Sequence, residues 1–540
     1  MKSMIAKSLR CGGATARIAL VSLALAAVGS TASQATPAGG KEGGAMVVAL
    51  PGDPPVINST ITTDISSSNI SGQVYSTIVR LDRDGKVLPY LAKSWDISPD
   101  GLTYTFHLYE GIKWHDGTPF TAEDVAWSLW NVNKKYNGPA SGLLAPVESI
   151  TAPDADTVVF KLKYPSPPLL RGLAYFNSST IVPKHLFDNG QDPRNNPANL
   201  KPVGTGPFVF KEYKKGSHII LEKNPNFHLE GLPHLDRLVF QIIPNEGARS
   251  IALEKGDIDF IPYYAMPLGE TETLRKNKEL VVTFAKRMIA GEYMAFLNTR
   301  EGPLAKKEVR QALYYALNRP DMLEKAGFGY GKISAGPVSS EQPIFYTEDV
   351  RKYGYDPALA NKMLDEAGYP RGADGKRFKL RVSFDLKEGP MNDVARLMRV
   401  NFAAVGVDLE IMGMDSGAWR DTAFKDWNFD ITMGSFSTGP DPAVGVERIY
   451  VCRNIERLMA RNASGYCNPQ LDEIFDKASR EGDEAKRVAL YREVQKILVE
   501  DAPHWWLWDR YYPIAFNARL EGLLDDPTGY GAFDVVYWKN

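Results

Sequence analysis

The stretch Gly111 to Val125, G-I-K-W-H-D-G-T-P-F-T-A-E-D-V, places a histidine among carboxylates and threonines. A histidine beside a carboxylate can act as a general acid or base, so catalysis is the first possibility. His115 lacks a second histidine or a nucleophile at a useful spacing, which argues against it. Asp116-Gly117 is typical of a hairpin turn, and Thr121 with Asp124 is typical of a capping box that begins a helix. We interpret the stretch as a hairpin that leads into a helix.

Other catalytic signatures are missing from the sequence. It contains neither a G-x-S-x-G nor an H-E-x-x-H motif. The glycine-rich G-T-G-P-F, Gly204 to Phe208, resembles a phosphate loop only superficially, because Pro207 has no amide donor and no Lys-Ser/Thr pair follows. We interpret it as a turn into the strand F-V-F-K-E-Y. A pair of distant carboxylates could still catalyse hydrolysis, so a secreted hydrolase stays the rival class, to be separated by a turnover assay.

The cysteines and histidines give little support for a metal site. Cys452 and Cys467 flank a loop-like segment, and a disulfide between them would stabilise the fold by about 3 kcal/mol in the chain-entropy model. Two unpaired thiols are the alternative. Two cysteines without nearby histidines do not form a zinc site, and the seven histidines are too scattered to bind nickel. We expect a disulfide and no metal.

The N-terminus has the three parts of a secretory signal. Basic residues precede the apolar run Ile18 to Val28, and small residues follow and end at Ala35. The run is far shorter than the roughly 20 residues of a membrane-spanning helix. Cys11 lies before the run, whereas a lipid-modified cysteine would follow it. We expect cleavage after residues 1–35 and a periplasmic protein without a lipid anchor.

Length and composition restrict the kinds of protein and of binding partner that the sequence allows. The chain has 540 residues, of which 24% are charged and 44% hydrophobic, as in ordinary globular proteins. It exceeds the roughly 250 to 300 residues at which one core stops growing, so at least two lobes are expected. The formal net charge of -2 argues against nucleic acid or an anionic membrane as the main partner. Local features must therefore select any ligand.

Helices and strands alternate along the chain. The pattern predicts a strand from Met46, a helix around Ser68 to Thr77, and a hairpin that turns on Asp84-Gly85. L-T-Y-T-F-H-L, which ends at Leu108, alternates as a strand with one buried face. V-R-Q-A-L-Y-Y-A-L has helical spacing, and a second helix is expected to end near Gly406 and lead into a strand. This alternation indicates an α/β protein.

Motifs in a fixed order extend the interpretation. D-G-L-T-Y-T-F-H-L-Y-E-G-I-K-W-H-D-G-T-P-F-T-A-E-D-V closely resembles the signature of the dipeptide, oligopeptide and nickel family of extracellular solute-binding proteins. Further matches follow in the family's order: G-T-G-P-F, N-P-N-F at Asn224 to Phe227, L-E-K-G-D-I-D at Leu253 to Asp259, L-N-T at Leu297 to Thr299, K-E-V-R-Q-A-L-Y-Y-A-L-N-R at Lys307 to Arg319, and Y-D-P-A-L-A-N-K-M-L-D-E-A-G-Y at Tyr355 to Tyr369. The resemblance covers nearly the whole mature chain.

The resemblance implies a two-lobed periplasmic-binding-protein fold of the clamshell type (type II) with an extra inserted subdomain. The expected division is a first lobe made of residues 36–80, 205–290 and 505–540, an insert of residues 81–204, and a second lobe of residues 291–504. Ligand would lie between the lobes. We expect a monomer.

The resemblance also implies a site on the loop Gly434 to Pro442. In peptide-binding relatives this loop offers backbone groups to the ligand, and an aspartate slightly upstream of the D-P pair takes the peptide's amino terminus. Here that place falls at about Thr438, which carries no charge. Asp441 could substitute, or it could be a turn former before proline. The candidate ligand-binding residues are Ser435, Phe436, Ser437, Thr438, Asp441, Trp419, Tyr293, Thr62 and Thr63. In W-W-L-W, Trp505 to Trp508, alternate residues face opposite ways, so half belong to the core and half could line the hinge or cleft.

The function implied by the resemblance is capture of a small solute for an inner-membrane ABC permease with a cytoplasmic ATPase. The solute that we expect is a peptide or a peptide-like compound. Lobe closure around the ligand would be the mechanism, without catalytic residues or cofactor. The same fold binding a non-peptide solute, such as an opine, a glycoside or another modified metabolite, is the alternative.

Overall fold

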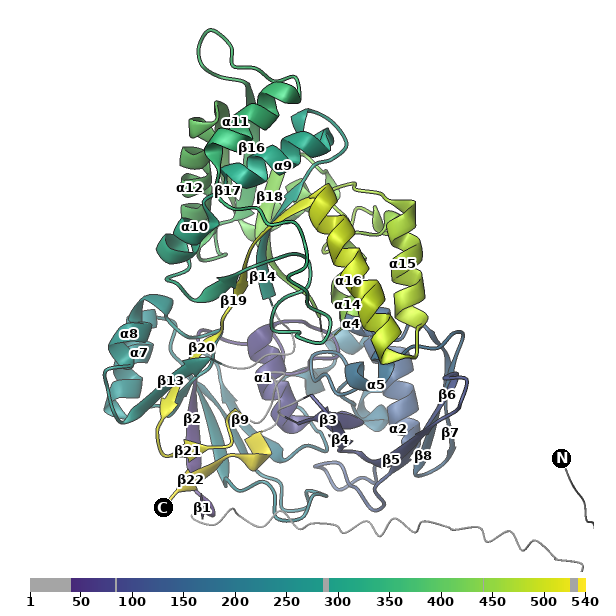
Figure 1. Ribbon diagram of the computed structural model, residues 1–540. Coiled ribbons are helices and arrows are strands. Elements are labelled where there is room, and N and C mark those ends of the chain that lie inside the picture. Colours follow the sequence, from purple (N-terminus) through teal and green to yellow (C-terminus); the bar gives the residue numbers. More distant parts are fainter. Residues whose placement is uncertain (1–39, 83–84, 285–290, 440, 525–532) are drawn as a thin grey trace, which may run out of the picture.

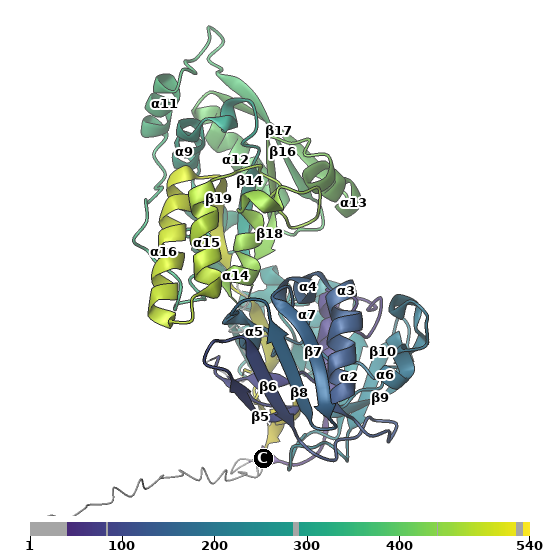
Figure 2. The same ribbon diagram turned by 90° about the vertical axis from the view of Figure 1, so that its right-hand side faces the viewer.

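The computed structural model describes residues 40–82, 85–284, 291–439, 441–524 and 533–540. They form two bodies stacked along the long axis of the molecule (Figures 1 and 2). The lower body holds both the first lobe and the insert, and the upper body is the second lobe. The predicted signal peptide, residues 1–35, and Asp84 of the expected hairpin lie outside the described residues.

The first lobe is built on a seven-stranded mixed sheet. Its strand order is β13-β20-β12-β2-β11-β10-β9, so segments from both ends and the middle of the chain share one sheet. The bounds are β13 (Leu280–Phe284), β20 (Pro513–Asn517), β12 (Phe260–Ile261), β2 (Ala45–Leu50), β11 (Arg237–Ile242), β10 (His218–Lys223) and β9 (Phe208–Lys214). Helices α1 (Ile65–Val74), α7 (Glu246–Lys255) and α8 (Thr271–Leu274) accompany it, and β1 (Gly40–Lys41), β22 (Tyr537–Lys539) and β21 (Leu520–Glu521) form a small separate sheet.

The insert has its own antiparallel sheet and its own hydrophobic core. The sheet contains β5 (Ala92–Ile97), β6 (Thr103–Leu108), β8 (Thr157–Leu162) and β7 (Val147–Asp154), beside the hairpin β3 (Val79–Leu81) and β4 (Val87–Pro89). Its helices are α2 (Ala122–Trp127), α3 (Lys134–Tyr136), α4 (Gly138–Leu143), α5 (Pro168–Gly172) and α6 (Lys184–Phe187). Alternate residues of β6 are buried, which confirms the prediction for L-T-Y-T-F-H-L.

The second lobe is a six-stranded sheet with helices on both faces. The strand order is β15 (Gly331–Ile333), β19 (His504–Arg510), β14 (Gly291–Leu297), β18 (Ile431–Ser437), β16 (Phe378–Asp385) and β17 (Val407–Met414). The helices are α9 (Lys307–Ala316), α10 (Arg319–Ala326), α11 (Pro357–Glu366), α12 (Met391–Ala404), α13 (Ser416–Arg420), α14 (Pro442–Gly445), α15 (Pro469–Arg480) and α16 (Glu484–Asp501). The two helices predicted here are present as α9 and α12, and Gly406 has the positive φ of 80° that ends the second.

Helix α1 begins earlier than predicted. The expected helix was Ser68 to Thr77, whereas α1 runs from Ile65 to Val74. The side chain of Asp64 accepts a hydrogen bond from the backbone N–H of Ser67 and so caps the first turn. The polar loop before it therefore ends at a cap that the apolar spacing alone did not reveal.

The C-terminal return to the first lobe also differs from the prediction. β19 pairs with β14 and β15 of the second lobe, so the crossing lies after Arg510 rather than at residue 505. Trp505, Trp506 and Trp508 are all fully buried in the core of that lobe. Helices cover both faces of the sheet, so the prediction that half of these side chains could line the cleft is wrong.

The hairpin at Gly111 to Val125 has the structural role predicted for it. A capping box joins Thr121 and Asp124 at the start of α2. The His115 Nδ1 accepts a hydrogen bond from the backbone N–H of Gly204, and Nε2 lies 3.0 Å from the Gly206 carbonyl. Burial lowers the pKa of His115 to about 4, so the ring is neutral at neutral pH and joins the insert to the first lobe.

The G-T-G-P-F segment packs against the end of α1 and leads into β9, as predicted. A Cβ atom at Gly204 would lie 1.8 Å from the Val74 carbonyl oxygen, and one at Gly206 would lie 2.6 Å from it. The backbone N–H of Gly206 donates to the same oxygen at 2.8 Å. The glycines are therefore required by close backbone approach.

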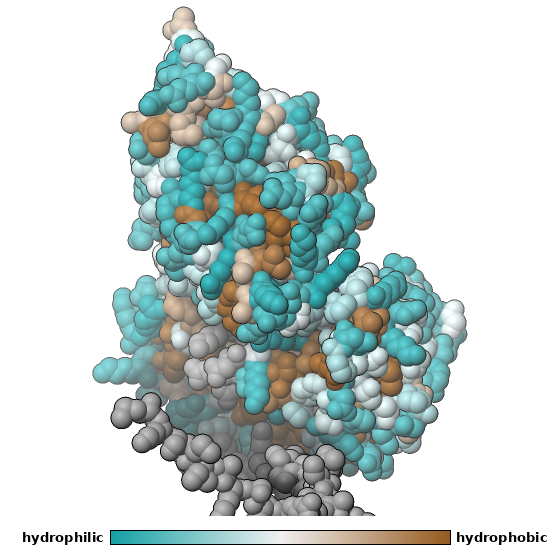
Figure 3. Space-filling model, turned by 45° about the vertical axis from the view of Figure 1, so that its right-hand side comes forward, coloured by the Kyte–Doolittle hydropathy of each residue, from teal (hydrophilic) through white to brown (hydrophobic). Residues whose placement is uncertain are grey.

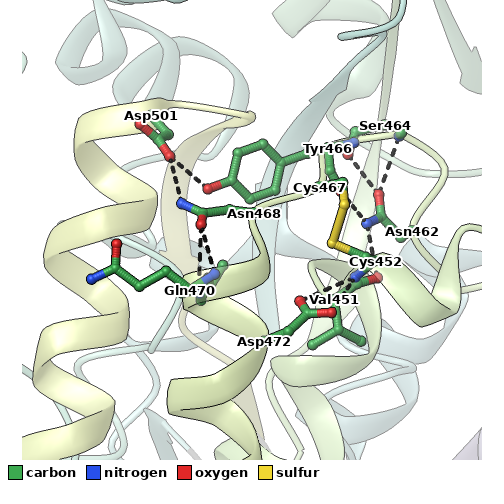
Figure 4. The surroundings of a disulfide bond; sticks show 12 residues. Val451, Cys452, Asn462, Ser464, Tyr466, Cys467, Asn468, Gln470, Asp472 and Asp501 are labelled. Carbon is green, nitrogen blue, oxygen red and sulfur yellow. Dashed lines mark hydrogen bonds between the residues drawn. A yellow bond between two sulfur atoms is a disulfide. The ribbon is translucent and has the colours of Figure 1, made fainter.

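Cys452 and Cys467 form the predicted disulfide (Figure 4). The bridge lies beside two helix ends of the second lobe. Asp472 of α15 accepts from the backbone N–H of Cys452, and Asp501 at the end of α16 accepts from the Tyr466 hydroxyl at 2.6 Å. The closed loop is thus fastened to both helices.

Thiol counting on the denatured, unreduced mature protein is expected to find no free cysteine. Reduction should lower the free energy of unfolding by about 3 kcal/mol, because the 15-residue separation then restores chain entropy to the unfolded state. The Cys452→Ser/Cys467→Ser variant should reproduce that loss without reductant. Two free thiols in the oxidised protein would contradict the bridge.

Candidate functional site

One edge of the second lobe's sheet carries several of the predicted site residues, on β14 and at the end of β18. β16, β17 and β18 are parallel, and β19 runs in the same direction because both β18 and β19 are antiparallel to β14. The carboxyl ends of these four strands therefore meet at one edge, where β14 also begins. In open α/β sheets, ligands bind outside the carboxyl ends of strands. The crossing after Arg510 leads from this edge into the first lobe, so the edge faces the junction between the lobes.

The predicted ligand-binding residues at the end of β18 lie partly at the surface and partly in the core. Ser435 and Ser437 are half-buried, and Thr438 is buried. Phe436 points into the core, where its ring lies 4.5 Å from that of Phe296. The structure therefore gives Phe436 a packing role. The Ser437 hydroxyl accepts from the backbone N–H of Gly439 and shapes the loop.

The Asp441 carboxylate makes its contacts with other residues of the second lobe. Its side chain accepts from the Ala443 N–H at the start of α14. Both carboxylate oxygens also accept from Arg487 of α16, at 2.8 and 2.5 Å, and both side chains are almost fully buried. Such a bidentate pair satisfies the carboxylate. The structural alternative for Asp441 is therefore the one observed, and the prediction that it binds ligand is corrected.

Trp419 lies behind β18. Its Nε1 donates to the Thr432 hydroxyl at 3.0 Å, and its ring packs against Phe424. A Cβ atom at Gly434 would lie 3.4 Å from the Trp419 ring, so the absence of a side chain at residue 434 leaves room for the ring. Only 8% of Trp419 is exposed. It supports the strand from its covered face.

Tyr293 and Ser435 are brought together by Arg510, which the sequence did not single out. The two are opposite each other on β14 and β18, and Arg510 Nη1 donates to the Ser435 hydroxyl at 2.7 Å. The guanidinium also lies 4.5 Å from the centre of the Tyr293 ring. Glu388 Oε1 is 3.6 Å from the guanidinium. The sequence signal for these two charged residues is their position at a strand end, since Arg510 is the last residue of β19 and Glu388 follows β16.

The contacts around Arg510 extend into the first lobe. Tyr512 follows the crossing, and its ring centre is 5.2 Å from the Arg510 guanidinium and 5.1 Å from the ring of Tyr263. Figure 3 shows hydrophobic side chains on both bodies at their junction. The junction thus offers aromatic and apolar surface beside a few polar groups, as small-molecule sites do.

Thr62 and Thr63 lie in the first lobe, on the loop before α1. The Thr62 hydroxyl accepts from the backbone N–H of Asp64, and Thr63 is exposed. None of the contacts described above joins them to β18. Their role in ligand binding stays a prediction.

Two absences concern the part of the chain that the structure describes. No group of three or more histidine, cysteine, aspartate or glutamate residues there could hold a metal ion. No helix in the same part of the chain is long and apolar enough to span a membrane.

Comparison with known proteins gives long and consistent matches. The model of the bacterial extracellular solute-binding proteins, family 5 (middle part), matches residues 86–456. The oligopeptide-binding protein AppA of Bacillus subtilis is 30% identical over 526 residues, which cover 92% of each chain. The glutathione-binding protein GsiB of Pectobacterium atrosepticum is 28% identical, covering 87% of this chain and 90% of its own. The solved structure of B. subtilis AppA with a nonapeptide has a TM-score of 0.77 and 26% identity, covering 93% of this chain and all of that one. The chain therefore belongs to the bacterial extracellular solute-binding proteins, family 5.

Proposed function

We propose that this solute-binding protein captures a peptide or peptide-like compound between its lobes and delivers it to an ABC importer. The observation that carries the proposal is the β18 edge, where Ser435, Tyr293 and Arg510 meet at the lobe junction. Backbone groups at strand ends suit extended peptides, which are bound mainly through main-chain hydrogen bonds. The names of AppA, an oligopeptide-binding protein, and of GsiB, a glutathione-binding protein, support the same ligand class, since glutathione is a tripeptide.

The mechanism that we propose is lobe closure without chemical change. β19 belongs to the sheet of the second lobe and β20 to that of the first, so the chain between them joins the lobes and can act as a hinge. A ligand that contacts both lobes stabilises the closed form by its extra affinity for that form. The proposal assigns no catalytic residue and no cofactor.

The cellular setting belongs to the same proposal. The basic, apolar and small-residue series ending at Ala35 supports export to the periplasm. There the protein would act as a monomer that docks on an inner-membrane permease whose ATPase is cytoplasmic. The family membership supports this setting, since its members are extracellular solute-binding proteins.

Native mass spectrometry of gently purified protein is expected to detect one bound small molecule per chain. Its mass should fit a short peptide and should be unchanged after long incubation, because no hydrolysis takes place. Denaturing and refolding the protein should remove the molecule, and short peptides should then rebind. Recovery of cleaved products, or of a ligand without any amide, would contradict the peptide proposal and favour a hydrolase or a non-peptide solute respectively.

A non-peptide or blocked solute is the second candidate. It is favoured by Thr438, which has no charge at the place where the resemblance leads one to expect an acid, and by Asp441, which is held by Arg487. A ligand without a free α-amine needs no carboxylate there. The comparison of free and acetylated peptides described below separates the two candidates.

A further inference from the structure

Glu388 is an acidic residue at the lobe junction to which no role has been assigned. It lies three residues after the end of β16, on the edge where β18 and β19 also end. Among the described residues, no N–H or O–H group donates a hydrogen bond to its carboxylate. Its ion-pair partner there is Arg510, whose Nη1 is 3.6 Å from Oε1, beyond ordinary hydrogen-bond length.

The side chain of Glu388 is partly covered by the protein. About 31% of the side chain is accessible. Burial nevertheless raises the pKa of the carboxyl above its ordinary value, against the opposing effect of Arg510. The carboxylate is therefore partly withdrawn from water and still within reach of a ligand. An ionised carboxylate in such a place gains strongly from a charged hydrogen-bond donor.

Other carboxylates at this edge are already used. Asp385 accepts from the backbone N–H of Lys387, and Asp415 caps the start of α13. Asp441 is paired with Arg487. Asp509 is 1% exposed and accepts from Ser340. Glu388 is therefore the carboxylate of this group that combines accessibility with unmet hydrogen-bonding capacity.

We propose that Glu388 receives the ammonium group of the ligand, in place of the acid missing at Thr438. The inference rests on the proposed function, because it presumes that the ligand is a peptide or carries a similar amine. Arg510 lies beside the carboxylate and favours its ionised form, while its contacts with Ser435 and Tyr293 keep the guanidinium at the edge of the sheet. A ligand ammonium would approach Glu388 from the open side.

The test compares two pools of mixed-sequence tetrapeptides that differ only in their amino ends, one free and one N-acetylated. Binding is measured by competition and native mass spectrometry on wild type and on Glu388→Gln, which keeps the shape and removes the charge. Glu410→Gln is the matched control, since Glu410 is a half-exposed residue on neighbouring β17 that pairs with Lys379. Wild type and control should prefer free amines about 10- to 100-fold, as a charged hydrogen bond allows.

In Glu388→Gln that preference should fall to about one, while binding of the acetylated pool and the melting temperature stay unchanged. A preference for free amines that survives in Glu388→Gln would overturn the assignment, as would a wild type that binds both pools equally. If wild type binds neither pool, the peptide proposal itself fails, and this inference fails with it. Loss of binding to both pools in Glu388→Gln alone would indicate a structural role and also overturn the assignment.

Discussion

Replacing Arg487 by methionine is expected to lower the free energy of unfolding by about 3 to 5 kcal/mol. The substitution leaves the Asp441 carboxylate inside the second lobe, where it is only 3% exposed, without the two N–H groups that now satisfy it. Arg487 also lies over the rings of Phe345 and Tyr491, so some packing is lost as well. Urea unfolding followed by tryptophan fluorescence measures the change, because Trp505, Trp506 and Trp508 lie in the same core.

The double variant Asp441→Asn/Arg487→Met should regain much of this stability, because it no longer buries an unpaired charge. The matched control is Arg492→Met, an exposed arginine on the same helix, which should change the free energy by less than about 0.5 kcal/mol. Equal losses for Arg487→Met and Arg492→Met would refute the buried pair. The pair would also be refuted if the double variant lost as much stability as Asp441→Asn and Arg487→Met together lose when each is measured alone.

The elements that were predicted correctly depend on residues close together in the sequence. The capping box of Thr121 and Asp124 spans four residues, and the alternation of β6 is visible within six. Gly406 ends a helix because its own backbone takes a positive φ. Local conformational preferences decide such features, and a single sequence displays them directly.

The site residues depend on partners that are distant in the sequence. The sequence pair D-P shows that Asp441 can form a turn. Its partner Arg487, however, is 46 residues away on another helix. Glu388 and Arg510 meet only because β16 and β19 end at the same edge of the sheet. The side chains of Trp505 to Trp508 face alternately to the two sides of β19, and all of them are buried because both sides of the sheet are covered. Strand order and layer arrangement decide these cases, and neither follows from one sequence.

Gly445→Ala is expected to abolish ligand binding and to cost at least about 3 kcal/mol of stability, at the upper end for overpacking. A Cβ atom at Gly445 would lie 1.9 Å from the Thr438 carbonyl oxygen and 2.2 Å from the Gly439 nitrogen. These are backbone atoms, so no side-chain rotation relieves the clash. Either α14 or the loop after β18 must therefore shift, and that loop is the predicted floor of the site.

Gly142→Ala is the matched control for this substitution. Gly142 is also in a short helix, α4, which approaches α14 from the insert, and a Cβ atom there would meet nothing within 4 Å. Alanine favours helix over glycine by up to about 1 kcal/mol, so the control should be neutral or slightly stabilising. Thermal unfolding and binding of the tetrapeptide pools measure both variants. If Gly445→Ala binds peptides as wild type does, the loop after β18 is not the floor of the site, because a displacement forced on its backbone would then leave the ligand untouched.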